Sequence, residues 1–186
     1  MNYDLRFAEW INNHRIRTLD NFFIIITDTA SFLAYAIPVL VLIYAFYKKS
    51  KILKVKGLQL LCSILLSTIT VTIIKNILQR KRPYEIDHLI QKLSGGGGFS
   101  FPSGHTADAF VMATAVTLVL TWKKWLLIPL WIWAFMVAYS RIMLGVHYLS
   151  DIAGAMIIGV CCAFIMNFIF KKFNHTGSLH NNQADN

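Results

Sequence analysis

Charged side chains are scarce in this sequence. Of its 186 residues, 15% are charged and 56% are apolar. A soluble domain of this length would carry about 25% charged residues and be about half apolar. The missing charges leave long uncharged blocks, namely 57–74, 109–122, 125–140 and 152–170. This pattern argues against a soluble helical bundle, because its helices would have to be apolar on every side.

Uncharged blocks of this length predict transmembrane helices. A bilayer core about 30 Å thick is crossed by roughly 20 apolar residues in a helix. We therefore predict an all-α fold, a polytopic membrane helical bundle forming one integral-membrane domain over 1–172. A polar, disordered cytoplasmic tail is expected at 173–186. The five expected transmembrane helices lie at 22–47, 57–78, 105–122, 125–144 and 149–170.

Acidic residues are rarer still, with 9 Asp and Glu against 18 Lys and Arg. The net charge of +9 could indicate nucleic-acid binding, but no basic face of a soluble module exists, so no nucleic-acid partner is expected. Lysines cluster at span ends in YKKSKILKVKG, TWKKW and FKKF, which the positive-inside rule places in the cytoplasm. The sequence thus predicts a multi-pass protein of the inner (cytoplasmic) membrane, with residues 79–104 and 141–148 facing the periplasm or the exterior.

Cysteine is also rare, and apolar leader segments are absent. Cys62, Cys161 and Cys162 show no C-x-x-C or His/Cys ligand spacing, so we interpret them as buried apolar thiols and expect no metal and no cofactor. Residues 1–21 have mixed charge and no apolar core, so no signal peptide is predicted there. Phe7, Trp10 and Ile11 fall near one helical face, which predicts an N-terminal amphipathic helix in the outer membrane interface.

Against this apolar background, three polar clusters fall on the predicted outer side. The first is KNILQRKRP, in which Lys75 and Arg82 are seven residues apart. Two helical turns would place them on nearly the same face, about 10 Å apart along the axis. A basic span end is the ordinary explanation, but a charge at the depth of Lys75 needs a partner.

The second cluster, PSGH, lies where a loop becomes the third predicted span. Free N–H groups and the positive dipole end at a helix start bind anions. Gly104 would let a ligand approach the backbone, and Ser103 could cap the helix or donate to the anion. A cap alone would not explain His105.

The third cluster is SRIMLGVHYLSD, with Arg141, His147 and Asp151. His147 and Asp151 stand at i and i+4, so they share a face if the last span begins near Gly145. A carboxylate bonded to one imidazole nitrogen leaves the other free as a base or nucleophile.

Two histidines, three cations and one helix N-terminus at one membrane face suit a phosphoryl group with several charged oxygens. One histidine could attack phosphorus while the other protonates the leaving oxygen. The cations could neutralise the charge without a divalent metal. The residues themselves therefore predict phosphoryl transfer at the outer membrane surface.

These clusters fit Lys-x6-Arg-Pro, Pro-Ser-Gly-His and Ser-Arg-x5-His-x3-Asp. The sequence thereby resembles the type 2 phosphatidic acid phosphatases (PAP2), the lipid phosphate phosphatase superfamily, as a small bacterial membrane member. The resemblance implies a metal-independent phosphatase with a phosphohistidine intermediate. His147 would be the nucleophile, Asp151 would orient it, and His105 would protonate the leaving group. The phosphoryl oxygens would be held by Lys75, Arg82, Ser103, Gly104 and Arg141.

The substrate is expected to be a membrane lipid phosphate or diphosphate, with undecaprenyl diphosphate preferred. Phosphatidylglycerophosphate, phosphatidic acid and lipid A are alternatives. Two other classes stay open: a vanadate-dependent haloperoxidase, and a non-catalytic lipid-binding or lipid-translocating protein. Asp108 is interpreted as structural support. The run Gly95–Gly98 could be a hinge over the site or only a linker. The sequence predicts no oligomeric state.

Overall fold

The structure is a computed structural model that describes residues 3–119 and 124–184. These residues form helices and connecting loops, with no strand in the described ranges. The all-α prediction is confirmed. The elements are α1 Tyr3–Asn13, η1 Arg17–Leu19, α2 Asp20–Tyr47, α3 Lys51–Leu78, α4 Pro83–Ile86, α5 Gly104–Val119, η2 Lys124–Leu127, α6 Ile128–Met143 and α7 Leu149–Ala184.

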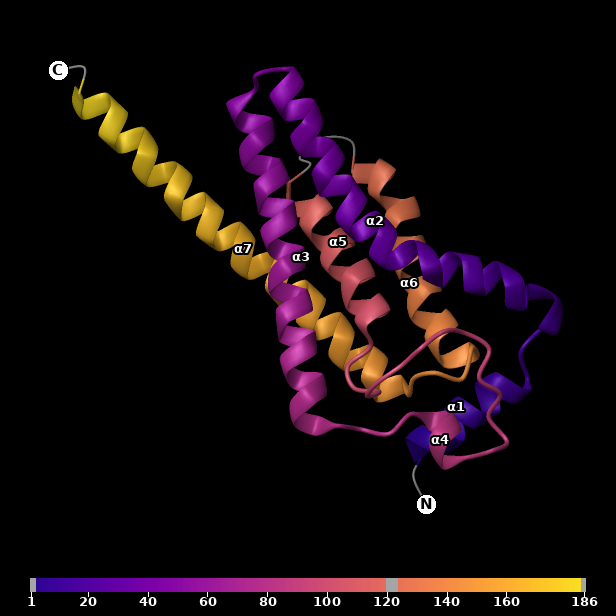
Figure 1. The fold of residues 1–186 in the computed structure, drawn as a ribbon. Helices are drawn as coiled ribbons and strands as arrows, with labels where there is room; N and C mark the ends of the chain where they lie inside the picture. The colour runs from indigo at the N-terminus through magenta and orange to yellow at the C-terminus, as the bar shows by residue number, and fades with distance from the viewer. Residues whose placement is uncertain (1–2, 120–123, 185–186) are drawn as a thin grey trace.

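Helix α5 lies at the centre of the bundle, between α2, α3, α6 and α7 (Figure 1). Most of its residues are buried, because it presents small and apolar side chains on all sides. The contact with α7 is especially close: a Cβ added at Gly159 would lie 2.8 Å from the Ala107 carbonyl oxygen and from the Val111 nitrogen. Small residues at such crossings let two helix backbones approach each other.

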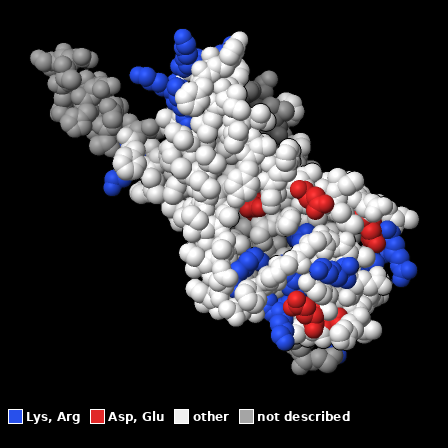
Figure 2. All heavy atoms as spheres, viewed as in Figure 1, with Lys and Arg blue, Asp and Glu red and all other residues white. Residues whose placement is uncertain are grey.

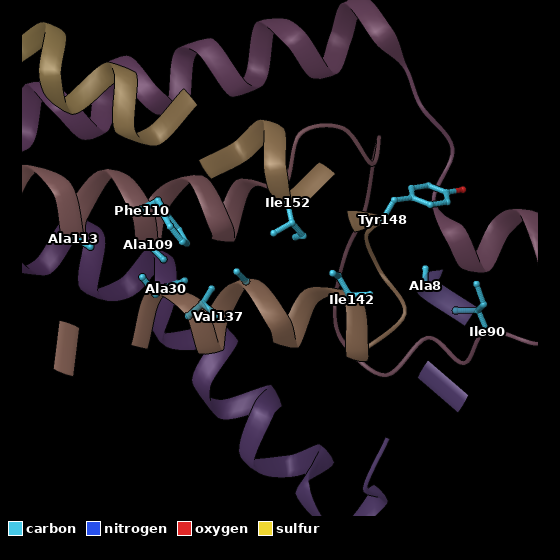
Figure 3. Packing of buried hydrophobic residues seen from close by; sticks show 12 residues of the cluster. Ala8, Ala30, Ile90, Ala109, Phe110, Ala113, Val137, Ile142, Tyr148 and Ile152 are labelled. Carbon is cyan, nitrogen blue, oxygen red and sulfur yellow. The ribbon is translucent and has the colours of Figure 1, made fainter. Parts of the chain in front are cut away.

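The apolar core is continuous from α5 toward the N-terminal helix (Figure 3). Phe110 of α5 packs edge-on against Trp131 and Phe135 of α6. At the end of the molecule that carries α1, Ile90 and Tyr148 extend the same cluster to Ala8 of α1. The loop before α5 and the start of α7 are thereby fixed against the bundle.

Three helices are long and apolar enough to cross a membrane: Arg17–Tyr47, Lys51–Ile86 and Leu149–Phe173. They coincide with the predicted spans at 22–47, 57–78 and 149–170. The other two predicted spans correspond to α5 and α6, which are apolar but have only 16 residues each. At 1.5 Å per residue each is about 24 Å long, short of the roughly 30 Å core. Residues 120–123, at the end of the predicted third span, lie outside the described ranges, as do parts of the TWKKW lysine cluster.

Helix α1 is present as predicted, and its buried side is fixed by polar contacts. Asn12 is fully buried: its Nδ2 donates to the carbonyl oxygens of Gln91 (3.0 Å) and Met143 (2.8 Å), and its Oδ1 accepts from the Gln91 N–H (2.8 Å). Trp10 and Phe7 remain exposed. The helix therefore anchors the loop after α4 to the end of α6 while presenting aromatic side chains outward.

Helix α7 continues to Ala184, whereas the sequence predicted disorder from 173 onward. Extending a helix that already exists costs less than starting a new one, which explains helix in so polar a segment.

Candidate active site

Three segments far apart in the sequence meet at the end of the bundle that carries α1 and α4. They are the C-terminal end of α3, the loop leading into α5, and the connection from α6 to α7 (Figure 1). The Ser103 N–H donates to the Asp151 carbonyl oxygen at 3.2 Å. Lys75 Nζ donates to the Phe99 carbonyl oxygen at 2.8 Å, and Ser100 Oγ donates to Asp151 Oδ2 at 2.5 Å. The three predicted polar clusters thus form one site.

The centre of the site is the pair formed by His147 and Asp151. Their Nδ1 and Oδ2 atoms are 3.2 Å apart, and both side chains are buried. Burial lowers the pKa of His147 to about 3, although the hydrogen bond with Asp151 opposes this shift. His147 is therefore neutral at pH 7. The carboxylate favours the tautomer with its proton on Nδ1, which leaves the Nε2 lone pair facing the site.

The local geometry of this pair differs from the sequence argument. Helix α7 begins at Leu149, so His147 lies in the preceding loop and not on the helix. Gly145 carries a φ of +76°, and a Cβ there would lie 2.4 Å from the Gln91 carbonyl oxygen. A glycine is required at this turn for both reasons. The turn directs His147 back onto Asp151 in the first turn of α7.

Asp151 accepts more hydrogen bonds than the sequence suggested. Arg80 Nη1 donates to Oδ1 at 2.7 Å, and the Tyr148 N–H donates to Oδ2 at 3.0 Å, beside the bond from Ser100. The Arg80 guanidinium also stacks over the Tyr148 ring, 3.8 Å from its centroid, and binds Asp4 of α1 at 2.8 Å. Arg80 and Ser100 were both missed by sequence reasoning.

Arg82 lies beside the nucleophile candidate, surrounded by carbonyl oxygens. Its Nη1 is 3.5 Å from His147 Nε2 and donates to the Val146 carbonyl oxygen at 3.1 Å. Its Nε and Nη2 donate to the carbonyl oxygens of Gly98 and Gly97, both at 3.0 Å. The expected helical alignment with Lys75 is wrong, because α3 ends at Leu78 and Gln79 adopts a left-handed conformation. The chain then leaves the axis of α3 and runs toward α4, so Arg82 reaches the site from a loop (Figure 1).

Arg141 is the most deeply buried of the three predicted cations. Its Nη1 donates to Thr27 Oγ1 (2.8 Å) and Ser94 Oγ (3.3 Å), and its Nη2 donates to the Gly95 carbonyl oxygen (3.4 Å). Its Nε is buried without a hydrogen-bond partner among the described residues. An unpartnered N–H on a buried guanidinium is costly, so it is a natural donor for an anionic ligand.

The glycine run joins these cations. Carbonyl oxygens of the segment from Gly95 to Phe99 accept hydrogen bonds from all three predicted cations, Arg141, Arg82 and Lys75. The segment is therefore part of the site and not a free linker.

The N-terminus of α5 faces the same site. Ser103 Oγ accepts from the Thr106 N–H at 3.4 Å and from Thr106 Oγ1 at 3.0 Å, so Ser103 acts as a cap. A Cβ added at Gly104 would meet nothing within 4 Å, which leaves open space before the helix N-terminus. His105 is half-buried and interacts electrostatically with Arg141, Arg82 and Lys75.

Two further acidic side chains near the site make structural contacts. Asp108 accepts from Ser31 Oγ of α2 at 2.7 Å, in agreement with the structural role expected for it. Glu85 accepts from the Arg82 N–H at 2.8 Å and so fixes the start of α4. Among the described residues, no group of three or more His, Cys, Asp or Glu side chains is placed to hold a metal ion.

A neutral histidine, a carboxylate bonded to it and cations gathered at one end of an apolar helical bundle suit an enzyme that acts on phosphate groups. The chain belongs to the PAP2 superfamily, whose family model matches residues 56–174, more than half of the sequence. The matched segment contains all eight predicted site residues.

Characterised relatives of this chain are lipid phosphatases. The chain is 42% identical over 77 residues to the lipid A 4'-phosphatase of Bacteroides thetaiotaomicron, a match covering 41% of this chain and 34% of that protein. This relative is thus matched over about a third of its length. The chain is 28% identical over 165 residues to the undecaprenyl-diphosphatase of Sulfolobus acidocaldarius, covering 88% of this chain and 76% of that protein.

Two solved structures share the fold. LpxE of Aquifex aeolicus superposes with a TM-score of 0.69 at 30% identity, covering 89% of this chain and 95% of that one. A transmembrane PAP2-type phosphatidylglycerolphosphate phosphatase from Bacillus subtilis superposes with a TM-score of 0.73 at 26% identity. The match covers 94% of this chain and 85% of that one. The predicted family is confirmed.

Proposed function

We propose that this protein is an integral membrane lipid phosphatase that hydrolyses undecaprenyl diphosphate through a phosphohistidine intermediate. One observation carries the proposal: the Nε2 of a buried, neutral His147 faces a guanidinium nitrogen of Arg82 at 3.5 Å. A lone pair held next to a cation is placed to attack an anionic phosphoryl group that the cation binds.

The chemistry proceeds in two steps. His147 Nε2 attacks the terminal phosphorus, and the bond from phosphorus to the bridging oxygen breaks. His105, in its protonated form, donates a proton to that oxygen and becomes neutral, so undecaprenyl phosphate leaves. Water then attacks the phosphohistidine while His105 takes a proton from it, and inorganic phosphate is released with His147 restored. Asp151 stabilises the positive charge that His147 carries in between.

The cations bind the phosphoryl oxygens and reduce their repulsion of the nucleophile. Arg141 offers its unpartnered Nε–H, and Lys75 donates to the Phe99 carbonyl oxygen while its ammonium can donate three hydrogen bonds in all. The N–H groups at the start of α5 complete the arrangement beside Gly104. Such preorganised donors act on charge that grows in the transition state, and each can contribute roughly 10²–10³ in rate.

The substrate assignment is supported by a relative matched over 88% of the chain, the undecaprenyl-diphosphatase of Sulfolobus acidocaldarius. A phosphorylated lipid A is the second candidate, because the lipid A 4'-phosphatase shows the higher local identity, 42% over 77 residues. Both substrates present a terminal phosphate on a lipid, and the site geometry suits either one.

The protein would lie in the inner membrane with five spans, α5 and α6 being the two short ones. The lysine-rich ends of α3 and α7 would face the cytoplasm, and the site would face the periplasm or the exterior. Residues 1–172 would form a single domain, with 173–186 as a cytoplasmic tail.

The test is phosphate release by the purified protein in detergent, with EDTA present. The panel is undecaprenyl diphosphate, lipid A, phosphatidylglycerophosphate and phosphatidic acid. We expect release to be fastest from undecaprenyl diphosphate and to vanish in His147→Ala. The matched control is His88→Ala, since His88 is exposed on the loop after α4.

Each outcome is decisive for one part of the proposal. Activity that survives in His147→Ala would refute the nucleophile, and activity lost in EDTA would refute metal independence. Release that is fastest from lipid A would replace the substrate but keep the mechanism. No release from any of the four lipids would favour a binding or translocating protein.

A further inference from the structure

A second polar feature lies at the opposite end of the bundle. A cleft of about 430 Å³ opens between the start of α3 and the far part of α7. Three lysines line it, Lys51 and Lys56 from α3 and Lys171 from α7. Lys51 and Lys75 are 24 residues apart on one helix, so the cleft is about 36 Å from the catalytic cations.

The cleft combines a polar end with an apolar wall. Gln59 is buried at its floor, where its Nε2 donates to Asn167 Oδ1 at 3.1 Å. Ile52, Val55 and Leu118 supply apolar lining. Lys56 also borders a second, apolar cavity of about 400 Å³ between α2, α3 and α5. A ligand that suits this cleft would carry a charged head and an apolar chain.

Among the residues that the structure describes, no acidic side chain pairs with these lysines. The sequence has no Asp or Glu at 29–84, at 109–150 or at 152–184. Figure 2 agrees for the face in view, since the end of the molecule opposite α1 and α4 shows blue atoms and no red ones. Among the side chains the structure describes, none of the ion pairs involves Lys51, Lys56 or Lys171.

The start of α3 adds to this positive potential. Ser50 Oγ caps the helix by accepting from the Leu53 N–H at 3.3 Å, and the first turn carries no acidic residue. The helix dipole places its positive end there, beside Lys51. Cations at this end are unfavourable unless an anion lies close by.

We propose that this cleft binds the headgroup of an anionic phospholipid from the leaflet opposite the catalytic site. The phosphate would lie between Lys56 and Lys171, and an acyl chain would follow the apolar wall. Basic pockets between membrane helices bind acidic lipid headgroups through this chemistry. The site is separate from the catalytic one, and the proposal does not depend on the phosphatase activity.

The test compares two variants that each lose two positive charges. Lys56→Gln/Lys171→Gln removes cleft lysines, whereas Lys48→Gln/Lys49→Gln removes exposed lysines outside the cleft. Thermal unfolding is followed by intrinsic tryptophan fluorescence in a neutral detergent. Phosphatidylglycerol, phosphatidylcholine or inorganic phosphate is added to each protein.

Phosphatidylglycerol should raise the Tm of the wild type and of the Lys48/Lys49 variant, while phosphatidylcholine should not. In the cleft variant that shift should disappear, corresponding to affinity about 30-fold weaker for two neutralised lysines. Lys56→Arg/Lys171→Arg should retain the shift. An unchanged Tm without lipid shows that the cleft variant is folded.

Three results would overturn the proposal. One is a phosphatidylglycerol shift that persists in the cleft variant. Another is an equal loss of the phosphatidylglycerol-induced Tm shift in both double variants, which would mean that general surface charge, and not the cleft, binds the lipid. The third is a stabilisation by inorganic phosphate that depends on Lys56 and Lys171, which would indicate a site for free anions. Phosphate release in the separate assay tests the catalytic proposal independently.

Discussion

Replacing Gly96 by alanine is expected to lower activity, because the added methyl group would collide with the Arg82 guanidinium. A Cβ at Gly96 would lie 2.7 Å from Nη1 and 3.2 Å from Cζ of Arg82. Ordinary van der Waals contact begins near 3.4 Å, so the guanidinium has to move by about 0.7 Å. The nitrogen concerned is the one that faces His147 Nε2.

A displacement of this size at a reacting centre is costly. Misplacement by about 1 Å can lower a rate by about 100-fold. We therefore expect kcat/KM of Gly96→Ala to fall by roughly 10- to 100-fold. The fall should appear mainly in kcat, because Arg141 and Lys75 still bind the phosphate.

The neighbouring glycine provides the matched control. A Cβ added at Gly97 would meet nothing within 4 Å, and its carbonyl would still accept from Arg82 Nη2. Both substitutions remove the same backbone freedom from the unfolded chain, about 0.4–1 kcal/mol. Gly97→Ala should therefore keep kcat/KM within about twofold of the wild type.

The assay is phosphate release at saturating and limiting substrate, with circular dichroism to verify the fold. Wild-type activity in both alanine variants would refute the reasoning, since it would mean that the glycine segment does not constrain Arg82. A comparable loss in both would point instead to a need for motion in this segment.

The other predictions concern the same site. Arg80→Gln should lower kcat by about 10- to 100-fold with little change in KM, because a charged hydrogen bond to Asp151 is lost. The control is Lys81→Gln at the exposed neighbouring residue, which should match the wild type in the same kinetic assay. The free energy of unfolding should decrease as the pH falls from about 6.5 toward 3, by up to about 1.4 kcal/mol per pH unit. The reason is that His147 takes up a proton in the unfolded chain, whereas burial in the folded protein lowers its pKa to about 3. A His147→Gln variant should lack this component in pH-dependent thermal unfolding. Vanadate should inhibit competitively by occupying the phosphoryl position next to Arg141, and activity unaffected by millimolar vanadate would contradict the assigned site.

The fold was largely predictable because the bilayer imposes simple requirements on sequence. Long apolar blocks of 14 or more residues located α2, α3, α5, α6 and the start of α7, although α7 extends to Ala184, well past the predicted end at 170. The spanning role of α5 and α6 is harder to predict. Both are shorter than a membrane core, and hydropathy alone does not distinguish a short span from a central buried helix.

The motifs predicted which residues come together at the site, but not the hydrogen bonds that connect them. Motif spacing located His147 and Arg82, yet it suggested helical geometry for both where the structure has turns. Arg80 and Ser100 were missed because their roles depend on contacts with Asp151, which is 71 and 51 residues away in sequence. Nothing in their local sequence distinguishes them from a basic span end and a loop serine.

The glycine run shows why sequence alone left two interpretations open. Backbone carbonyls bind the cations here, and a carbonyl is present at every residue whatever its side chain. What glycine adds is the absence of a Cβ, which matters at Gly96, where Arg82 lies 2.7 Å away, and not at Gly95 or Gly97, where space is open. The consecutive glycines therefore have different roles, and only the position of Arg82 reveals which of them has no room for a side chain. The same contact links the loop to the proposed mechanism, since a Cβ at Gly96 would displace Arg82 Nη1, which faces the proposed nucleophile His147.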